Sequence, residues 1–285
     1  MGSQETIKEI FDVVADAAPH IKSGMQNRRE YVGEENPSSE KQMEADVWAN
    51  ELLKELITNI EGVGQYASEE EQGITNCGEG LSVAIDPLDG SSNIPTNNLV
   101  GTIVGIYEDK LPCKGEKLVS ALYVLYGPLT TITIVEGEQV NEYVVEEKQG
   151  DQVETVKASK DIEVPSATVY GFGGNKNWKE EFRELEADIS RNLKLRYGGA
   201  LVGDFNQALH HGGVFGYPAR TDAPEGKYRL LFEANPMAYI MEKAGGKSTN
   251  GQESILQVNA SELHQRTPFF VGDKGEIAEL EEKLN

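Results

Sequence analysis

The chain has 285 residues, of which 48 are acidic and 26 are basic, so its formal net charge at pH 7 is −22. This charge argues against nucleic acid or an anionic membrane surface as a partner, because it repels both at long range. Hydrophobic residues make up 38% of the chain, and no apolar run reaches the roughly 18 residues that cross a bilayer, so we expect a globular protein without a membrane span.

The first part of the chain predicts two helices and a strand. Apolar residues between 7 and 21 recur at helical spacing, and a second amphipathic pattern predicts a helix over about 41–60. Between these helices, residues 33–39 have the composition of a loop. Residues 81–85 form a short apolar run, which we expect to be a strand that ends in a turn at Asp86.

The remainder predicts an antiparallel sheet followed by alternating strands and helices. Apolar runs joined by glycine-containing turns predict strands at 99–107, 118–126, 130–135 and 140–145. After Pro165 the extended segments are 168–172, 193–197, 214–217 and 269–271. The helical segments are 177–192, 200–210, 230–244 and a last helix from residue 273. We therefore expect an α/β protein of two lobes, residues 1–165 and 166–285.

The cysteines and the first residues bear on the cellular compartment. Cys77 and Cys113 do not make a disulfide framework, and the residues after Met1 lack the basic region and apolar core of an export signal. The sequence therefore predicts a cytoplasmic protein. A net charge of −22 exceeds the magnitude of about 2–8 that keeps a small domain soluble, which favours adaptation to a salt-rich cytoplasm over ordinary solubility.

The most informative segment is the octapeptide DPLDGSSN at residues 86–93. Asp86 and Asp89 lie three residues apart at the end of a predicted strand, so both carboxylates can converge on one cation. Gly90 and Ser91 expose backbone N–H groups that suit an anion held by that cation. The alternative is an ordinary surface turn, since all the polar residues here are turn formers.

Other acidic residues indicate a metal site only when they are considered together. Glu69 and Glu70 belong to a short acidic run, Asp46 lies in a predicted helix, and Glu233 precedes an Asn-Pro pair. Taken singly, each is typical of a solvated surface. Divalent cations require several oxygen ligands, however, and a carboxylate near such a cation is a natural base for activating water.

A basic group stands out against the acidic background. Arg196 and Tyr197, then Tyr217, then Lys227 and Arg229 combine cations with tyrosine hydroxyls, a pattern that suits a phosphorylated sugar. The alternative is that the tyrosines are core aromatics and the cations lie on the surface.

Three segments, in this order, resemble the class I fructose-1,6-bisphosphatase family, within the sugar-phosphatase superfamily that includes the inositol monophosphatases. They are the octapeptide 86–93, residues 226–246 (GKYRLLFEANPMAYIMEKAGG) and residues 264–268 (HQRTP). The resemblance implies a five-layered α-β-α-β-α sugar-phosphatase fold. It also implies a gluconeogenic activity that uses Mg²⁺ or Mn²⁺ to hydrolyse the 1-phosphate of fructose 1,6-bisphosphate, giving fructose 6-phosphate and phosphate.

The resemblance also implies roles for individual residues. The implied metal ligands are Glu69, Asp86, the Leu88 carbonyl, Asp89 and Glu233, with Glu40 near a third metal where the family has an aspartate. Glu70, with Asp46 behind it, matches a carboxylate pair that takes the proton from the attacking water. The implied substrate contacts are Arg196, Tyr197, Tyr217, Lys227 and Arg229, and Asn175 is the best candidate for the family's asparagine near the 6-phosphate.

Regulation and assembly follow from the same resemblance. The lysine–tyrosine pair that binds AMP in eukaryotic members corresponds to Gly80 and Leu81, which argues against inhibition by AMP through that site. The arginine that corresponds to Arg196 reaches into a neighbouring subunit's site, which implies at least a dimer and favours a homotetramer.

Two alternatives stay open. A sedoheptulose-1,7-bisphosphatase or a broader sugar phosphatase would share the same metal site. A catalytically silent metal-binding scaffold on the same fold is the alternative from a different functional class.

Overall fold

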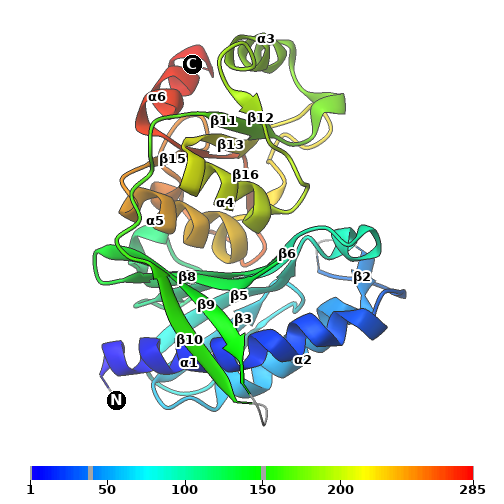
Figure 1. The fold of residues 1–285 in the computed structure, drawn as a ribbon, viewed down its shortest axis with the longest axis vertical. Coiled ribbons are helices and arrows are strands. Elements are labelled where there is room, and N and C mark those ends of the chain that lie inside the picture. Colours follow the sequence, from blue (N-terminus) through cyan, green and yellow to red (C-terminus); the bar gives the residue numbers. More distant parts are fainter. Residues whose placement is uncertain (1, 38–40, 149–151, 285) are drawn as a thin grey trace.

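The computed structural model describes residues 2–37, 41–148 and 152–284, arranged in layers of helices and sheets (Figure 1). The chain starts with helix α1 (Ser3–Gly24), whose buried face includes Ile7, Ile10 and Val14, as the helical spacing predicted. Among the described residues, no helix has both the length and the apolar character needed to cross a membrane.

The second helix is shorter than predicted. Residues Lys41–Met43 form a strand, β2, which pairs antiparallel with β1 (Tyr31–Glu35), so part of the expected loop is extended as well. Helix α2 (Glu44–Thr58) begins only afterwards, where Asp46 Oδ2 accepts a hydrogen bond of 2.7 Å from the backbone N–H of Met43. This carboxylate satisfies an N–H group that the first helical turn cannot, which fixes the boundary.

An eight-stranded sheet has the order β10-β9-β8-β7-β6-β5-β3-β4. Its strands are β3 (Val63–Ser68), β4 (Ile74–Asn76), β5 (Leu81–Asp89), β6 (Val100–Tyr107), β7 (Leu118–Tyr126), β8 (Thr130–Glu136), β9 (Gln139–Glu147) and β10 (Val153–Ser159). The predicted antiparallel strands are confirmed, and β3, β4 and β10 are additional. Strand β5 does not end before Asp86 but continues to Asp89, and its register with β6 shifts between these two residues. The shift accommodates Pro87, which has no N–H group for the ladder.

A second, five-stranded sheet has the order β12-β11-β13-β17-β15. Its strands are β11 (Val169–Phe172), β12 (Lys194–Leu195), β13 (Gly213–Tyr217), β15 (Lys247–Thr249) and β17 (Phe269–Gly272). Strands β14 (Tyr228–Arg229) and β16 (Arg266–Thr267) pair antiparallel in a separate two-stranded sheet. The remaining α-helices are α3 (Glu180–Ile189), α4 (Leu201–His211), α5 (Asn235–Lys243) and α6 (Lys274–Leu284).

The predicted helix over 230–244 is not uniform. Residues Leu230–Ala234 form a wider π-helical turn, and α5 follows from Asn235. Pro236 lacks the N–H group that would continue a regular ladder into the preceding turn, which explains the change of geometry. The turn carries Glu233, and such π turns often occur at functional sites.

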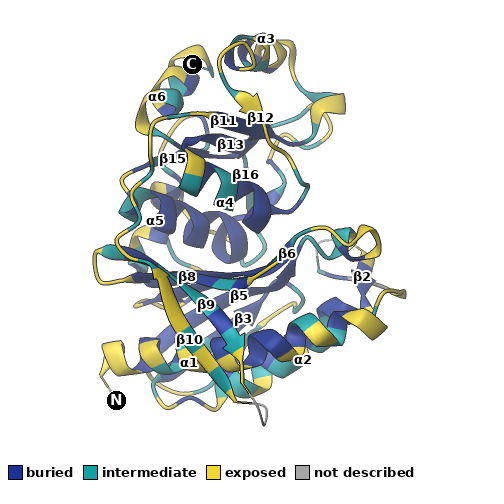
Figure 2. Cartoon of the chain, viewed as in Figure 1, coloured by how far each residue is buried: buried dark blue, intermediate teal, exposed yellow. Residues whose placement is uncertain are grey.

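Five layers stack along the molecule, as the family resemblance implied. Helices α1 and α2 cover one face of the large sheet, α4 and α5 lie between the two sheets, and α3 and α6 cover the small sheet (Figure 1). The middle helices are the most buried, and one hydrophobic core continues from Tyr123 of the large sheet through Phe205 and Met237 to Phe269 of the small sheet (Figure 2). The division of the chain into two lobes at Pro165 stays a prediction.

Candidate active site

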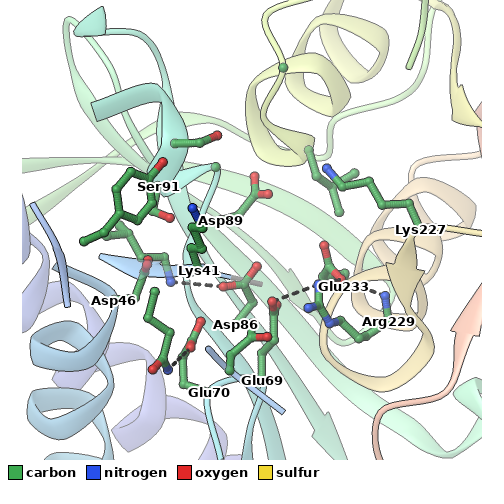
Figure 3. A pocket seen from close by; sticks show the side chains of 18 residues that line it. Lys41, Asp46, Glu69, Glu70, Asp86, Asp89, Ser91, Lys227, Arg229 and Glu233 are labelled. Carbon is green, nitrogen blue, oxygen red and sulfur yellow. Dashed lines mark hydrogen bonds and ion pairs between the residues drawn. The ribbon is translucent and has the colours of Figure 1, made fainter. Parts of the chain in front are cut away.

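A cavity of about 310 Å³ lies where the end of β5, the turn after β3, the start of α4 and the segment before α5 meet (Figure 3). It brings together many of the side chains singled out from the sequence. The predicted site residues that line it are Asp46, Glu69, Glu70, Asp86, Leu88, Asp89, Gly90, Ser91, Lys227, Arg229 and Glu233. Glu40, the candidate near a third metal, lies outside the described residues.

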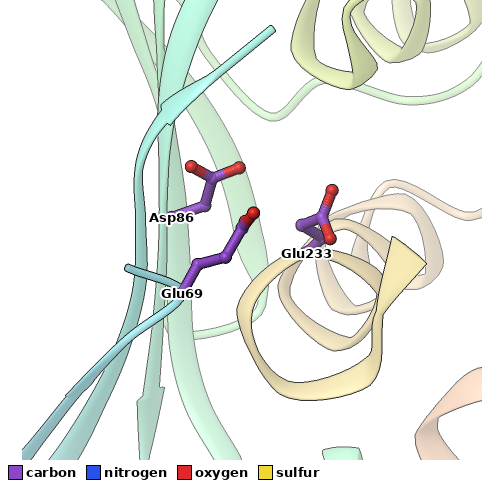
Figure 4. Close-up of side chains that lie close together, drawn as sticks. All are labelled: Glu69, Asp86 and Glu233. Carbon is purple, nitrogen blue, oxygen red and sulfur yellow. The ribbon is translucent and has the colours of Figure 1, made fainter. Parts of the chain in front are cut away.

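Three buried carboxylates form the centre of the site. One oxygen each from Glu69, Asp86 and Glu233 lies within 4.8 Å of the others, and Glu233 faces Glu69 and Asp86 from the helical side (Figure 4). Glu69 directly follows β3, which runs parallel to β5, so both side chains emerge at the same edge of the sheet. A bond of 3.0 Å from the Glu69 N–H to the Ile85 carbonyl fixes this alignment.

Burial makes this cluster electrostatically unfavourable by itself. Desolvation raises the pKa of Glu233 to about 8, and the neighbouring Glu69 adds to the rise. The pKa of Asp86 is likewise raised well above its usual value, by burial and then by Glu69 and Asp89. Buried carboxylates with raised pKa values are stabilised as anions by a cation. Three oxygen ligands in this geometry therefore fit a hard divalent metal ion.

Arg229 lies inside the carboxylate cluster. Its side chain is only 2% exposed, and its Nη1 atom is 2.9 Å from Glu69 Oε1 and 3.6 Å from Glu233 Oε2. The backbone N–H of Arg229 also donates to Glu233 Oε2 at 2.7 Å. The resemblance implies that this arginine contacts the sugar and its 6-phosphate. In the structure its guanidinium pairs with Glu69 and Glu233, and its role toward the substrate stays a prediction.

The octapeptide spans the end of β5, a turn at Gly90 and the start of a 3-10 helix (Ser91–Thr96), and its turn packs against the start of α4. Asp89 is buried, and its Oδ2 atom accepts a bond of 2.7 Å from the Val202 N–H in the first turn of that helix. Burial raises the pKa of Asp89 to about 7 although this bond lowers it. Gly90 has a φ of 75°, and a Cβ atom there would lie 2.5 Å from the Ala200 Cβ. Only glycine fits, so the turn brings its backbone close to α4.

Glu70 and Asp46, the predicted proton-accepting pair, both line the cavity. Glu70 accepts a hydrogen bond from the Gln42 side chain, and its own N–H donates to Ser68 Oγ at 3.2 Å. Sequence reasoning missed Gln42 and Lys41, which line the cavity from β2. No local pattern marked them, because their position depends on the pairing of β1 with β2.

The predicted sugar contacts fall into two groups. Lys227 lines the cavity, and its Nζ atom is 5.3 Å from the ring centroid of Tyr217, whose side chain lies outside the cavity wall. A Cβ atom on Gly173 would lie 2.8 Å from the Tyr197 hydroxyl and 2.2 Å from the Tyr217 ring, so these two tyrosines are close together. Arg220, which the sequence did not single out, donates to the Tyr217 hydroxyl at 2.8 Å.

Asn175 and Arg196 are predicted substrate contacts that lie on the surface. Asn175 is exposed, and its backbone carbonyl accepts a bond from Arg183. Arg196 is exposed beside Tyr197, and neither Asn175 nor Arg196 lines the cavity. Their roles toward the substrate stay predictions.

Comparison with known proteins gives the same family along nearly the whole chain. The family model for the N-terminal domain of fructose-1-6-bisphosphatase matches residues 6–157, and the model for its C-terminal domain matches residues 164–285. A class 1 fructose-1,6-bisphosphatase from Natronomonas pharaonis is 48% identical over 98% of this chain and 99% of its own length. One from Halobacterium salinarum is 46% identical over 98% of each chain.

A solved structure agrees with these sequence relatives. The holo form of Leishmania major fructose-1,6-bisphosphatase superimposes with a TM-score of 0.90 at 29% identity, covering 98% of this chain and 94% of that one. The resemblance noted from the three sequence segments is thereby confirmed over both sheets. The chain belongs to the class 1 fructose-1,6-bisphosphatase family.

Proposed function

We propose that this chain hydrolyses the 1-phosphate of fructose 1,6-bisphosphate, giving fructose 6-phosphate and phosphate in gluconeogenesis. The observation that carries the proposal is the convergence of Glu69, Asp86 and Glu233 into one buried cluster beside the octapeptide turn. The family membership shared with the class 1 enzymes of Natronomonas pharaonis and Halobacterium salinarum supports the same substrate.

The metal proposed for the site is Mg²⁺ or Mn²⁺. Its ligands would be the carboxylates of Glu69, Asp86, Asp89 and Glu233 with the Leu88 carbonyl, a set of oxygens that suits either ion. When bound, such an ion neutralises the charge of the phosphate oxygens and lowers the pKa of a water molecule.

The chain's own groups would perform the remaining steps. Glu70 would accept a proton from the attacking water. The Gln42 side chain orients Glu70 by a hydrogen bond, and Asp46 at the start of α2 lines the same cavity. The backbone N–H groups of Gly90 and Ser91 would orient the phosphate that is cleaved. Lys227, with Tyr217, Tyr197 and Arg196 in the second lobe, would hold the phosphate that is not cleaved, and this binding positions the reacting one.

An assay of phosphate release tests the proposal. We expect release from fructose 1,6-bisphosphate to require Mg²⁺ or Mn²⁺ and to stop when EDTA removes the metal. The variant Asp89→Asn should lose on the order of 100-fold or more in kcat, the scale of removing one charge-stabilising group from an active site. Asp12→Asn, an identical change on the exposed face of α1, serves as the matched control and should keep full activity.

The alternatives give different results in the same assay. A panel that includes sedoheptulose 1,7-bisphosphate and sugar monophosphates separates a dedicated enzyme from a broader phosphatase. Metal binding by calorimetry with no turnover of any sugar phosphate would instead support the silent scaffold and would refute the proposed activity.

We also propose that the enzyme is a homotetramer. Leu195 and Tyr197 flank Arg196 and are 58% and 47% exposed, so this segment presents apolar surface that an adjoining subunit would cover. Sedimentation-velocity measurements should give a mass of about four chains, and a monomer at assay concentration would contradict the proposal. The cytoplasmic location stays a prediction.

A further inference from the structure

A second cavity, of about 540 Å³, lies away from the carboxylate cluster, where the end of α1 meets residues 97–100 and the turn between β7 and β8. Its polar wall consists of Lys22, Gln26, Arg29, Asn97 and Asn98. None of the described residues that line it is acidic, although acidic residues outnumber basic ones by 48 to 26 in the chain. The cavity is therefore a local concentration of cations and amide donors in an acidic protein.

Lys22 is a cation of this cavity whose ammonium group bonds to neutral oxygen atoms. It is half-buried, and its ammonium group donates to the Gly127 carbonyl at 3.0 Å and to Thr130 Oγ1 at 3.2 Å. Both acceptors are neutral, and within residues 2–37, 41–148 and 152–284 no carboxylate oxygen forms an ion pair with Lys22. An ammonium group has three N–H donors, so one remains for a ligand. A partly desolvated cation held by neutral groups is stabilised by an added anion.

We propose that this cavity binds a multiply charged oxyanion of phosphate chemistry, such as a phosphorylated metabolite. Lys22 and Arg29 would supply two positive charges, and a guanidinium pairs with phosphate oxygens through two parallel bonds. The side-chain amides of Gln26, Asn97 and Asn98 add further donors at the rim. Met25 and Leu99 give an apolar wall for an organic part of the ligand.

The cavity is connected to the active site by a short chain of hydrogen bonds. Asn98 Nδ2 donates to the Gly198 carbonyl at 3.0 Å, and Asn93 Nδ2 donates to the same oxygen at 3.1 Å. The neighbouring Gly199 lines the catalytic cavity, and its N–H donates to Asp204 at 3.0 Å. An anion held by Asn97 and Asn98 would therefore restrain the segment that carries Arg196 and Tyr197.

Calorimetric titration of the metal-free chain with pyrophosphate tests the site. EDTA removes any metal, so the carboxylates of the active site repel pyrophosphate there. The measured Kd does not depend on catalysis. At the lowest salt concentration that keeps the chain folded, wild type should bind pyrophosphate, and Lys22→Gln/Arg29→Gln should raise the Kd at least about 10-fold. Lys148→Gln/Lys157→Gln makes the same charge change just after β9 and on β10, and should leave the Kd unchanged.

Several results would overturn the assignment. They are an absence of binding by wild type, equal binding by the Lys22→Gln/Arg29→Gln variant, and loss of binding in Lys227→Gln, which would place the anion in the active site. Arg29 is exposed, so Arg29→Gln alone should fold normally and still raise the Kd. Hydrogen–deuterium exchange in residues 196–199 should slow when pyrophosphate binds, and unchanged exchange would remove the connection to the active site.

Discussion

At the scale of single residues, the active site depends on how buried charges compensate one another. Arg229 contributes one positive charge between Glu69 and Glu233, while Asp86 and Asp89 add two more buried carboxyl groups. Burial raises the pKa values of Asp86, Asp89 and Glu233, and the neighbouring carboxylates that one arginine cannot neutralise add to the rise. The site is therefore built to be stabilised by a divalent cation, and the metal-free chain retains protons that the metal would displace.

This imbalance predicts an unusual pH dependence for the metal-free chain. The pKa values of Asp89 and Glu233 are about 7 and about 8 in the folded chain, whereas carboxyl groups in an unfolded chain titrate near pH 4. Between about pH 4 and about pH 8 the folded state thus binds more protons than the unfolded state. The free energy of unfolding therefore falls as the pH rises through this range. The slope is up to about 1.4 kcal/mol per pH unit for each carboxyl group.

Urea unfolding in EDTA at constant KCl measures this effect. We expect lower stability at about pH 8 than at about pH 5.5, and recovery at the higher pH when Mg²⁺ is added. Asp89→Asn removes one of the titrating groups and should flatten the dependence. A metal-free chain that gains stability with rising pH would show that these carboxyl groups are not perturbed as described.

At the scale of elements, the start of α4 connects the two halves of the site. Asp89 from β5 accepts the Val202 N–H, and Asp204 in the same helical turn accepts the N–H groups of Gly198 and Gly199. Burial raises the pKa of Asp204 to about 6, while these two backbone bonds lower it. One helix end thus contacts both the turn at Asp89 and the segment that follows Arg196.

The variant Asp204→Ala should separate substrate binding from metal binding. Two backbone N–H groups would lose their acceptor, which costs about 1–3 kcal/mol for each group that stays buried and unsatisfied. Because the Arg196 segment would loosen, we expect KM for fructose 1,6-bisphosphate to rise several-fold while the metal affinity stays near that of wild type. Steady-state kinetics and metal titration by calorimetry measure the two quantities.

Asp273→Ala is the matched control for this variant. Asp273 accepts the N–H groups of Gly275 and Glu276 at the start of α6, so its loss should also reduce stability by about 1 kcal/mol. Because α6 covers the far face of the small sheet, KM should not change. An equal rise of KM in both variants would mean that general destabilisation, and not the position of the Arg196 segment, causes the effect.

At the scale of the whole molecule, the net charge of −22 opposes the compact state through self-repulsion. Exposed salt bridges between lysines and carboxylates offset little of this repulsion, since such pairs contribute about 0–1 kcal/mol each. Salt shortens the range of the repulsion to about 3 Å at 1 M ionic strength. The composition therefore favours a salt-rich working environment.

Thermal unfolding over a KCl series tests this prediction. The midpoint should rise as KCl increases from about 0.1 M to about 2 M, because screening stabilises the folded chain more than the expanded one. The activity should also increase or hold over the same range. A midpoint and an activity that are both highest at low ionic strength would contradict adaptation to salt.

The sequence by itself determined the local features of this protein. Helical spacing identified α1, apolar runs between glycine-containing turns identified β6 to β9, and the octapeptide 86–93 with the segment 226–246 was sufficient to indicate the family. Each of these patterns depends on residues that are close along the chain, where spacing and propensity control the conformation.

Tertiary structure decided which distant groups meet. The extension of β5 to Asp89, the pairing of β1 with β2 and the π-helical turn at Glu233 each depend on partners elsewhere in the chain. Those contacts place Arg229 among carboxylates and bring Gln42 to Glu70. Side-chain spacing along the sequence carries no information about them, because the energies that select them arise only when both sheets and the middle helices pack together.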